Sequence, residues 1–126
     1  MRPRSNSSED ESHSEAVKIA VIVRELSEVL TPRIVAGIAG ITDPQQVCEW
    51  EAGKSAPTEP AQLRLRFAHS VLGEIQAARR TSVAQAWAVT INPRLYYSTP
   101  VKAIREGRFI ETKAAVQALL EEAYDG

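Results

Sequence analysis

The sequence predicts an all-α protein, and three observations lead to this fold class. Apolar residues recur three and four positions apart along most of the chain, as on the buried face of an amphipathic helix. Most breaks between these segments carry a Thr or Ser that suits a helix cap, often with a Pro in the next turn. No segment alternates polar and apolar residues for long enough to build a sheet. We therefore expect helices joined by short turns.

Length and charge limit the possible functions. The 126 residues, 44% of them hydrophobic, suffice for one compact domain or for two small helical lobes that share a core, which excludes a large multidomain enzyme. The net charge of -1 lacks the strong positive field of most stand-alone nucleic-acid binders. Any contact with DNA must therefore come from a local basic patch or from the pairing of two subunits.

The cellular setting follows from cysteine usage and hydropathy. Cys48 is the single cysteine, so no internal disulfide forms, and no Cys/His group has metal-ligand spacing. The longest apolar run, residues 16–23, contains Lys18 and is too short to cross a bilayer. An acidic stretch precedes it, unlike the basic start of a secretory signal. We expect a soluble, cytoplasmic protein without a metal.

The N-terminal part divides into a tail and a first helix. Residues 1–13 are Ser-rich and acidic without apolar periodicity, which predicts a flexible tail. The first helix is expected to begin at Ser12 or Ser14 and to end near Leu30, because Ser12 and Glu15 have capping-box spacing. Its core stripe consists of Ile19, Ile22, Val23, Leu26 and Leu30.

Val17 and Val21 form a second apolar strip on the same helix. In a monomer the C-terminal helices of the chain would cover this strip. In a dimer a partner subunit would cover it.

Residues 31–53 have the layout of a helix-turn-helix. Thr31 and Pro32 start a short apolar helix through Ala39, and Gly40 supplies a tight turn. A second helix is expected from Thr42, which has capping-box spacing to Gln45, to Gly53. Val47 and Trp50 lie three residues apart and face the core, so the opposite side of this helix is free to enter a major groove.

The candidate DNA-binding residues lie on the outer side of this segment. Gln pairs well with adenine, and Glu accepts a hydrogen bond from cytosine. The alternative is a degenerate segment kept for packing, in which Gln45 completes the cap while Asp43 and Glu49 repel phosphates. The nearest cations, Arg33, Lys54, Arg64 and Arg66, are the candidate phosphate partners. The DNA-binding candidates are Arg33, Asp43, Gln45, Gln46, Glu49 and Lys54.

The remaining elements follow the same rules. A long helix is expected over residues 59–79, with a broad buried face formed by Leu63, Leu65, Phe67, Ala68, Val71, Leu72 and Ile75. Shorter helices are expected over residues 82–91 and 99–107, with a loop at 92–98 between them. A last helix covers residues 111–124, with Ala115, Val116, Leu119, Leu120 and Ala123 on its apolar side.

Nothing in the sequence predicts catalysis. His13 lies in the predicted tail, and His69 has no Ser, Cys or Asp placed to form a relay with it. Cys48 follows Val47 and precedes Glu49, and a neighbouring carboxylate disfavours the thiolate form that a nucleophile needs. No Gly-rich phosphate loop or paired-carboxylate group appears. We expect a protein that is not an enzyme and needs no cofactor.

Two motifs resemble one family of regulators. The run Trp50-Glu51-Ala52-Gly53-Lys54 followed by Pro57 resembles the W-E-x-G-K-x-x-P ending of the recognition helix in Xre-type regulators. The order Trp87, Asn92-Pro93, Leu95, Thr99-Pro100, Ile104 and Gly107 resembles the toxin-binding segment of Xre/MbcA/ParS-type antitoxins. Together the resemblance covers residues 17–124.

The resemblance implies a division of labour within the chain. Residues 14–80 would form the Xre-like helix-turn-helix domain, and residues 81–126 would form the toxin-binding segment. The family neutralises RES-domain toxins, which are NAD-consuming enzymes. The implied partners are a RES-domain toxin, operator DNA and a second copy of the chain. The alternative is a stand-alone helix-turn-helix transcriptional regulator whose C-terminal helices dimerise.

The candidate toxin-binding residues lie in and after the 92–98 loop. Pro93 and Pro100 stiffen this loop, and aromatic and Arg side chains are the types most enriched at interface hot spots. Cations just beyond the loop suit a pocket made for a pyrophosphate cofactor. The alternative is that the two Tyr rings cover the end of the helical core and the cations are merely exposed. The candidates are Arg94, Tyr96, Tyr97, Lys102, Arg105 and Arg108.

Overall fold

The structure of the protein, a computed structural model, describes the backbone of residues 5–125 and the side chains of residues 17–122. Within residues 5–125 it contains no strand, and the all-α prediction is confirmed. The elements are α1 (Ser5–Val29), α2 (Pro32–Ala39), α3 (Pro44–Glu51), α4 (Glu59–Ala78), α5 (Thr81–Val89), the 3₁₀ helix η1 (Pro93–Leu95), α6 (Pro100–Arg105) and α7 (Phe109–Asp125).

Three helices begin with a Thr cap and a Pro in the first turn, as the sequence predicts for α2 and α6. The hydroxyl oxygens of Thr31, Thr58 and Thr99 each accept a hydrogen bond from the backbone N–H three residues later, at 3.2, 3.4 and 3.2 Å. The Pro that follows needs no N–H partner at this position, and its fixed φ suits a helix. These caps define the starts of α2, α4 and α6.

Two predicted helix starts were wrong. Helix α1 begins at Ser5 and not at Ser12 or Ser14, so residues 5–13 of the predicted tail belong to this helix. This stretch contains neither Pro nor Gly, the two residues that most strongly break helices. Residues 1–4 lie outside the described residues. Helix α3 is capped by Asp43 and not by Thr42, because Pro44 takes the first helical position.

The core lies where α1, α2, α3 and α4 meet. Helix α4 packs against α1 and α2, and α3 packs against both α1 and α2. Trp50 contributes the largest buried side chain of α3, with only 5% of its surface exposed. The most deeply buried aliphatic side chains of this cluster are Ile19, Val23, Leu26, Val35, Ile38, Val47, Leu65, Val71, Ile75 and, from α7, Val116.

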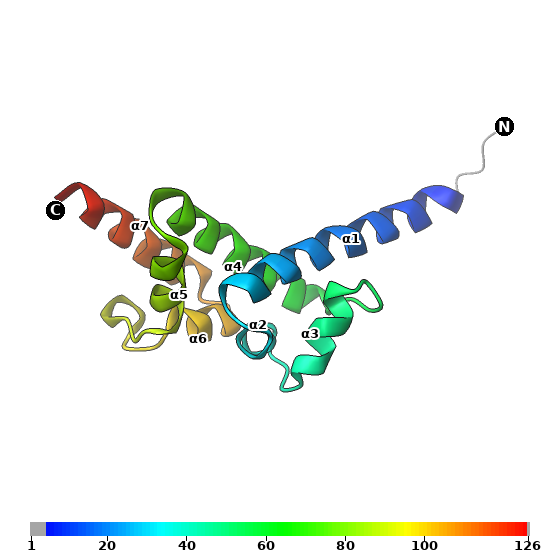
Figure 1. Ribbon diagram of the computed structural model, residues 1–126, viewed down its shortest axis with the longest axis horizontal. Helices are drawn as coiled ribbons and strands as arrows, with labels where there is room; N and C mark the ends of the chain where they lie inside the picture. Colours follow the sequence, from blue (N-terminus) through cyan, green and yellow to red (C-terminus); the bar gives the residue numbers. More distant parts are fainter. Residues whose placement is uncertain (1–4, 126) are drawn as a thin grey trace.

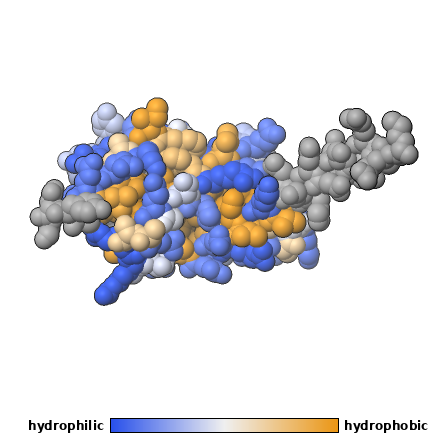
Figure 2. All heavy atoms as spheres, turned by 90° about the horizontal axis from the view of Figure 1, so that it is seen from above, coloured by the Kyte–Doolittle hydropathy of each residue, from blue (hydrophilic) through white to orange (hydrophobic). Residues whose placement is uncertain are grey.

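Some apolar residues lie outside the core. Leu63 was predicted on the buried face of α4 but is 63% exposed. Val17 and Val21 are exposed too, so the described helices of the chain leave this strip of α1 uncovered. Figure 2 shows one face of the molecule, on which apolar side chains form separate groups with hydrophilic side chains between them. No described helix is both long enough and apolar enough to cross a lipid bilayer.

The fold places the two predicted binding segments on either side of this core. Helix α3 lies on one side of α2, while α5, η1 and α6 lie on the other (Figure 1). Helix α6 packs against α2 and α4 as well as against α5 and α7. The ring of Phe67 on α4 stacks on that of Phe109 at the start of α7, with centroids 4.4 Å apart. These contacts join the C-terminal helices to the rest of the domain.

Arg64 joins α4 to the end of α2. Its Nε donates to the carbonyl oxygen of Ile38 at 3.1 Å, and its Nη2 donates to that of Ala39 at 2.6 Å. Carbonyls at the end of a helix have no partner within the helix, so Arg64 satisfies two of them. Gly40 ends α2 with a φ of 85°, a conformation that glycine adopts without strain. Arg64 was expected to be a phosphate partner, and its internal hydrogen bonds correct that expectation.

Replacing Arg64 with alanine is expected to lower the free energy of unfolding by about 1–3 kcal/mol, since two carbonyl oxygens lose a charged donor. Urea denaturation followed by circular dichroism measures this change. Leu63→Ala, at the neighbouring exposed position, is the control and is expected to change the free energy by less than about 0.5 kcal/mol. Equal effects of the two substitutions would contradict the capping role of Arg64.

Candidate binding surfaces

The first candidate surface is the outer side of α3. Val47 and Trp50 point into the core, so the opposite side of the helix faces solvent. The structure brings five of the predicted DNA-binding residues together on α3 and its two flanks, and all five are exposed: Asp43, Gln45, Gln46, Glu49 and Lys54. Arg33 is exposed on the first turn of α2.

Asp43 has a structural role on this surface. Its Oδ1 accepts a hydrogen bond from the backbone N–H of Gln45 at 2.9 Å, which caps α3. The side chain that caps α3 is therefore that of Asp43, and Gln45 takes part in the cap only through its backbone N–H. The side chains of Gln45, Gln46 and Glu49 carry the polar groups of α3 that remain available to a partner. The mixed charges of Asp43, Glu49 and Lys54 give this surface little net attraction for phosphates.

The second candidate surface is the 92–98 loop, which closes on itself through backbone hydrogen bonds. The N–H of Asn92 donates to the carbonyl oxygen of Ser98 at 2.9 Å, and the N–H of Tyr97 donates to that of Asn92 at 3.0 Å. The side-chain oxygen of Asn92 also caps η1 by accepting from the N–H of Arg94 at 2.9 Å. Leu95 is fully buried and anchors the loop to the helices below it. The loop therefore has one defined conformation.

Tyr96 and Tyr97 project from the tip of this loop. Their side chains are 80% and 72% exposed, so the alternative in which they cover the end of the core was wrong. Both residues have positive φ values, 55° and 63°. This region costs a non-glycine residue about 1–2 kcal/mol, which the loop's hydrogen bonds and the burial of Leu95 must offset. The loop thus holds two aromatic rings in solvent while its backbone adopts an unfavourable conformation at both positions.

Arg108 holds the 92–98 loop in place through hydrogen bonds to two of its residues. Its Nη2 donates to the Oγ of Ser98 at 2.9 Å, and its Nη1 donates to the carbonyl oxygen of Leu95 at 3.4 Å. The guanidinium also pairs with Glu106 and Glu111, at 2.9 and 3.2 Å. Partial desolvation lowers the pKa of Arg108, but the two carboxylates raise it by more, so the net shift of the pKa is upward. Arg108 therefore positions the loop, while its role as a direct toxin contact stays a prediction.

Replacing Arg108 with alanine is expected to speed amide hydrogen exchange at Tyr97 and Ser98 by about ten-fold or more, because the loop loses two hydrogen bonds from a charged donor. Exchange followed by mass spectrometry or NMR measures this opening. Arg105→Ala serves as the control, since Arg105 is exposed on α6 and has no contact of this kind with the loop. Unchanged exchange in the Arg108 variant would show that the loop closes without it.

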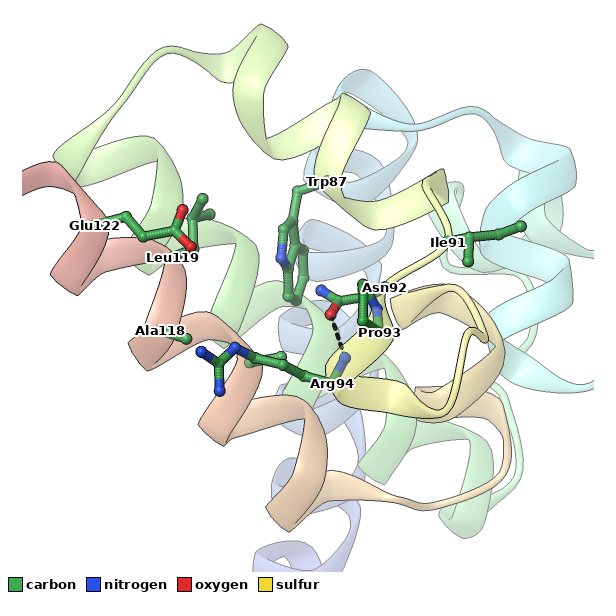
Figure 3. Close-up of a pocket in the computed structure, with 9 residues that line it drawn as sticks. Trp87, Ile91, Asn92, Pro93, Arg94, Ala118, Leu119 and Glu122 are labelled. Atoms are coloured by element: carbon green, nitrogen blue, oxygen red, sulfur yellow. Dashed lines mark hydrogen bonds between the residues drawn. The ribbon is translucent and has the colours of Figure 1, made fainter. Parts of the chain in front are cut away.

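A groove runs beside Trp87, between α5 and α7, and we call it the Trp87 groove (Figure 3). It consists of two hollows of about 580 and 390 Å³ that share Trp87, Ile91, Asn92 and Leu119. Trp87 is partly buried, so its ring forms part of the groove wall as well as part of the core. The α7 residues of the larger hollow are Ala115, Ala118, Leu119 and Glu122.

Sequence reasoning missed this groove. Ala115 and Leu119 were assigned to the apolar side of the last helix, and only the packing of α7 against the rest of the chain determines how far they stand from Trp87.

Three other residues singled out in the sequence do not line this groove. Lys102 and Arg105 are exposed on α6, and His69 pairs with Glu25 across α1 and α4 at 2.7 Å. The side chain of His13 lies outside the described residues.

Comparison of the chain with protein-family models, with curated proteins and with solved structures finds no match. The resemblance to Xre/MbcA/ParS-type antitoxins therefore depends on the two motifs. In the structure, the first motif begins at a Trp that packs in the core, and the second begins at a Trp that lines a groove. The interpretation of both surfaces must come from their own geometry and chemistry.

Proposed function

We propose that the protein is an antitoxin that binds and neutralises a RES-domain, NAD-consuming toxin through its C-terminal third. The observation that carries this proposal is the exposure of Tyr96 and Tyr97 on a loop with a fixed conformation. Tyr and Arg are the residue types that dominate interface hot spots. Because the loop is ordered before it meets a partner, binding loses little conformational entropy.

The proposed contact residues divide into a centre and an outer ring. Arg94, Tyr96 and Tyr97 form the centre, since all three are exposed on the same loop. Lys102 and Arg105 are exposed on the helix that follows, where their charges suit a pocket that accepts a pyrophosphate group. Arg108 contributes by holding the loop.

Growth rescue tests the neutralising role. The first step is to find whether a RES-domain protein is encoded beside this chain's gene, and to express that protein in a bacterial host, alone and together with this chain. We expect the wild-type chain to restore growth and Arg94→Ala to restore it less, whereas Gln117→Ala, an exposed substitution outside this surface, leaves rescue unchanged. The neutralising role fails if no such toxin is encoded there, or if growth arrest persists with the wild-type chain.

A second proposed role is repression of the chain's own promoter through α2 and α3. The observation in its favour is the set of exposed amide and carboxylate groups on the outer side of α3, opposite the buried Trp50. Because the net charge is only -1, a tight complex requires two subunits on two half-sites, about 34 Å apart. The uncovered strip of Val17 and Val21 on α1 is a candidate site for the second subunit.

Gel-shift assays with DNA from upstream of the gene test this role. We expect a shift that weakens in a Gln45→Ala, Gln46→Ala double variant, and we expect a dimer by sedimentation. A strictly monomeric protein would count against DNA binding. Tight promoter binding by a chain that has no toxin partner would instead favour the alternative, a stand-alone transcriptional regulator whose C-terminal helices dimerise.

A further inference from the structure

The Trp87 groove offers an apolar surface that the chain leaves uncovered. Trp87 stands between α5 and α7, and the side chain of Leu119 faces it from α7 (Figure 3). Ala115 and Ala118 are small, and their size leaves the larger hollow open beside the indole ring. Ile91, which also lines both hollows, is 62% exposed. An apolar side chain placed here would remove all of these surfaces from water.

Two opposite charges lie at the edge of this groove. The side chain of Arg94 reaches over α7 near Ala118, and Glu122 lies beside Leu119 one turn further along (Figure 3). Within residues 17–122 neither charged group has an ion-pair partner, although other charged residues of the domain are paired. An occupant with a carboxylate at one end and a cation at the other would complement both charges.

The chemistry of the groove favours a protein segment over other occupants. In the larger hollow, the side-chain oxygen of Asn92 already accepts the N–H of Arg94. The lining therefore offers mainly an apolar wall and two opposite charges, a combination that an amphipathic protein segment matches. Arg94 also belongs to the 92–98 loop, so the groove continues the surface assigned above to the toxin.

We infer that the Trp87 groove receives an amphipathic segment of the toxin, whose large apolar side chain packs against Trp87 between a carboxylate facing Arg94 and a cation facing Glu122. This inference rests on the proposed function and extends it from the loop to α7. It makes α7 part of the toxin interface, and it makes Ala118 a position where a larger side chain excludes the toxin.

Filling the groove tests the inference. Ala118→Phe places a ring in the larger hollow, and Gln117→Phe places the same ring on the exposed, opposite side of α7 as a matched control. The titration uses the full-length chain and the purified RES-domain protein encoded beside its gene. We expect Ala118→Phe to weaken binding by about ten-fold or more and Gln117→Phe by less than about two-fold. Thermal unfolding by circular dichroism checks that both variants fold.

The charges provide an independent test. Glu122→Lys reverses the charge at one end of the groove without filling it, and we expect weaker binding whose loss shrinks as salt is raised. If Ala118→Phe and Glu122→Lys both bind like the wild type while loss of the two Tyr rings abolishes binding, the groove is empty in the complex and the proposed function stands. If the wild-type chain does not bind the toxin, both fail together.

The other possible occupants give different outcomes. If a second copy filled the groove, sedimentation of the chain alone would show self-association that Ala118→Phe abolishes, and the inference would be overturned. If a small molecule filled it, Ala118→Phe would leave toxin affinity unchanged, which also overturns the inference.

Discussion

Replacing Trp50 with alanine is expected to destabilise the protein by about 3–5 kcal/mol, the range for removing a buried Trp or Phe ring. Trp50 is 5% exposed and belongs to the main core cluster, so the substitution leaves a cavity that its neighbours cannot fill. A domain of this kind has a total stability of about 5–15 kcal/mol, so the loss removes a large part of it at the lower end of this range. Guanidinium denaturation measures the change.

The control for this prediction lies on the same helix. Cys48 is exposed, and Cys48→Ala is expected to change stability by less than about 0.5 kcal/mol. A Trp50→Ala protein within about 1 kcal/mol of the wild type would mean that α3 is only loosely attached to the core. In that case α3 could not present a fixed surface to DNA.

A double glycine variant, Tyr96→Gly with Tyr97→Gly, is expected to weaken toxin binding by about a hundred-fold or more, because hot-spot side chains contribute 2 kcal/mol or more each. Glycine adopts the positive φ of both positions without strain, so the loop keeps its backbone path. The variant therefore removes the two Tyr rings and leaves the backbone of the 92–98 loop in place. Calorimetric titration with the RES-domain protein measures the affinity.

Two further variants separate the role of the rings from that of the backbone. A Tyr96→Phe, Tyr97→Phe variant keeps both rings and is expected to lose less affinity than the glycine variant. A Tyr96→Val, Tyr97→Val variant places β-branched residues at positive φ and is expected to destabilise the loop itself. Folded glycine variants that bind the toxin as tightly as the wild type would move the interface away from the loop.

Features that depend on local chemistry could be predicted from the sequence. The starts of α2 and α6 follow from Thr-Pro pairs, whose caps act over three residues. The same reasoning was wrong at α3, because Thr42 and Asp43 are both good caps and only Pro44 decides between them. It was also wrong at Leu63, since helical periodicity gives the spacing of a buried face and not its width.

Features that depend on contacts between distant segments could not be predicted. The exposure of Tyr96 and Tyr97 was one of two alternatives that the sequence left open, and only the structure decides between them. The roles of Arg64 and Arg108 were not anticipated, because each guanidinium binds carbonyl oxygens that lie elsewhere in the chain. The Trp87 groove depends on where α7, which packs on α4, α6 and η1, lies relative to α5, and no spacing within a single helix reveals that distance.

The closure of the 92–98 loop between Asn92 and Ser98 has a consequence for how such proteins diverge. Its backbone bonds involve main-chain atoms, so the side chains at its tip can change while the ends stay joined, provided that they tolerate the positive φ of positions 96 and 97. Under the proposed function, exchanging these side chains would alter toxin specificity without remodelling the helices. Transplanting this tip onto another antitoxin of the proposed class would then transfer the choice of toxin.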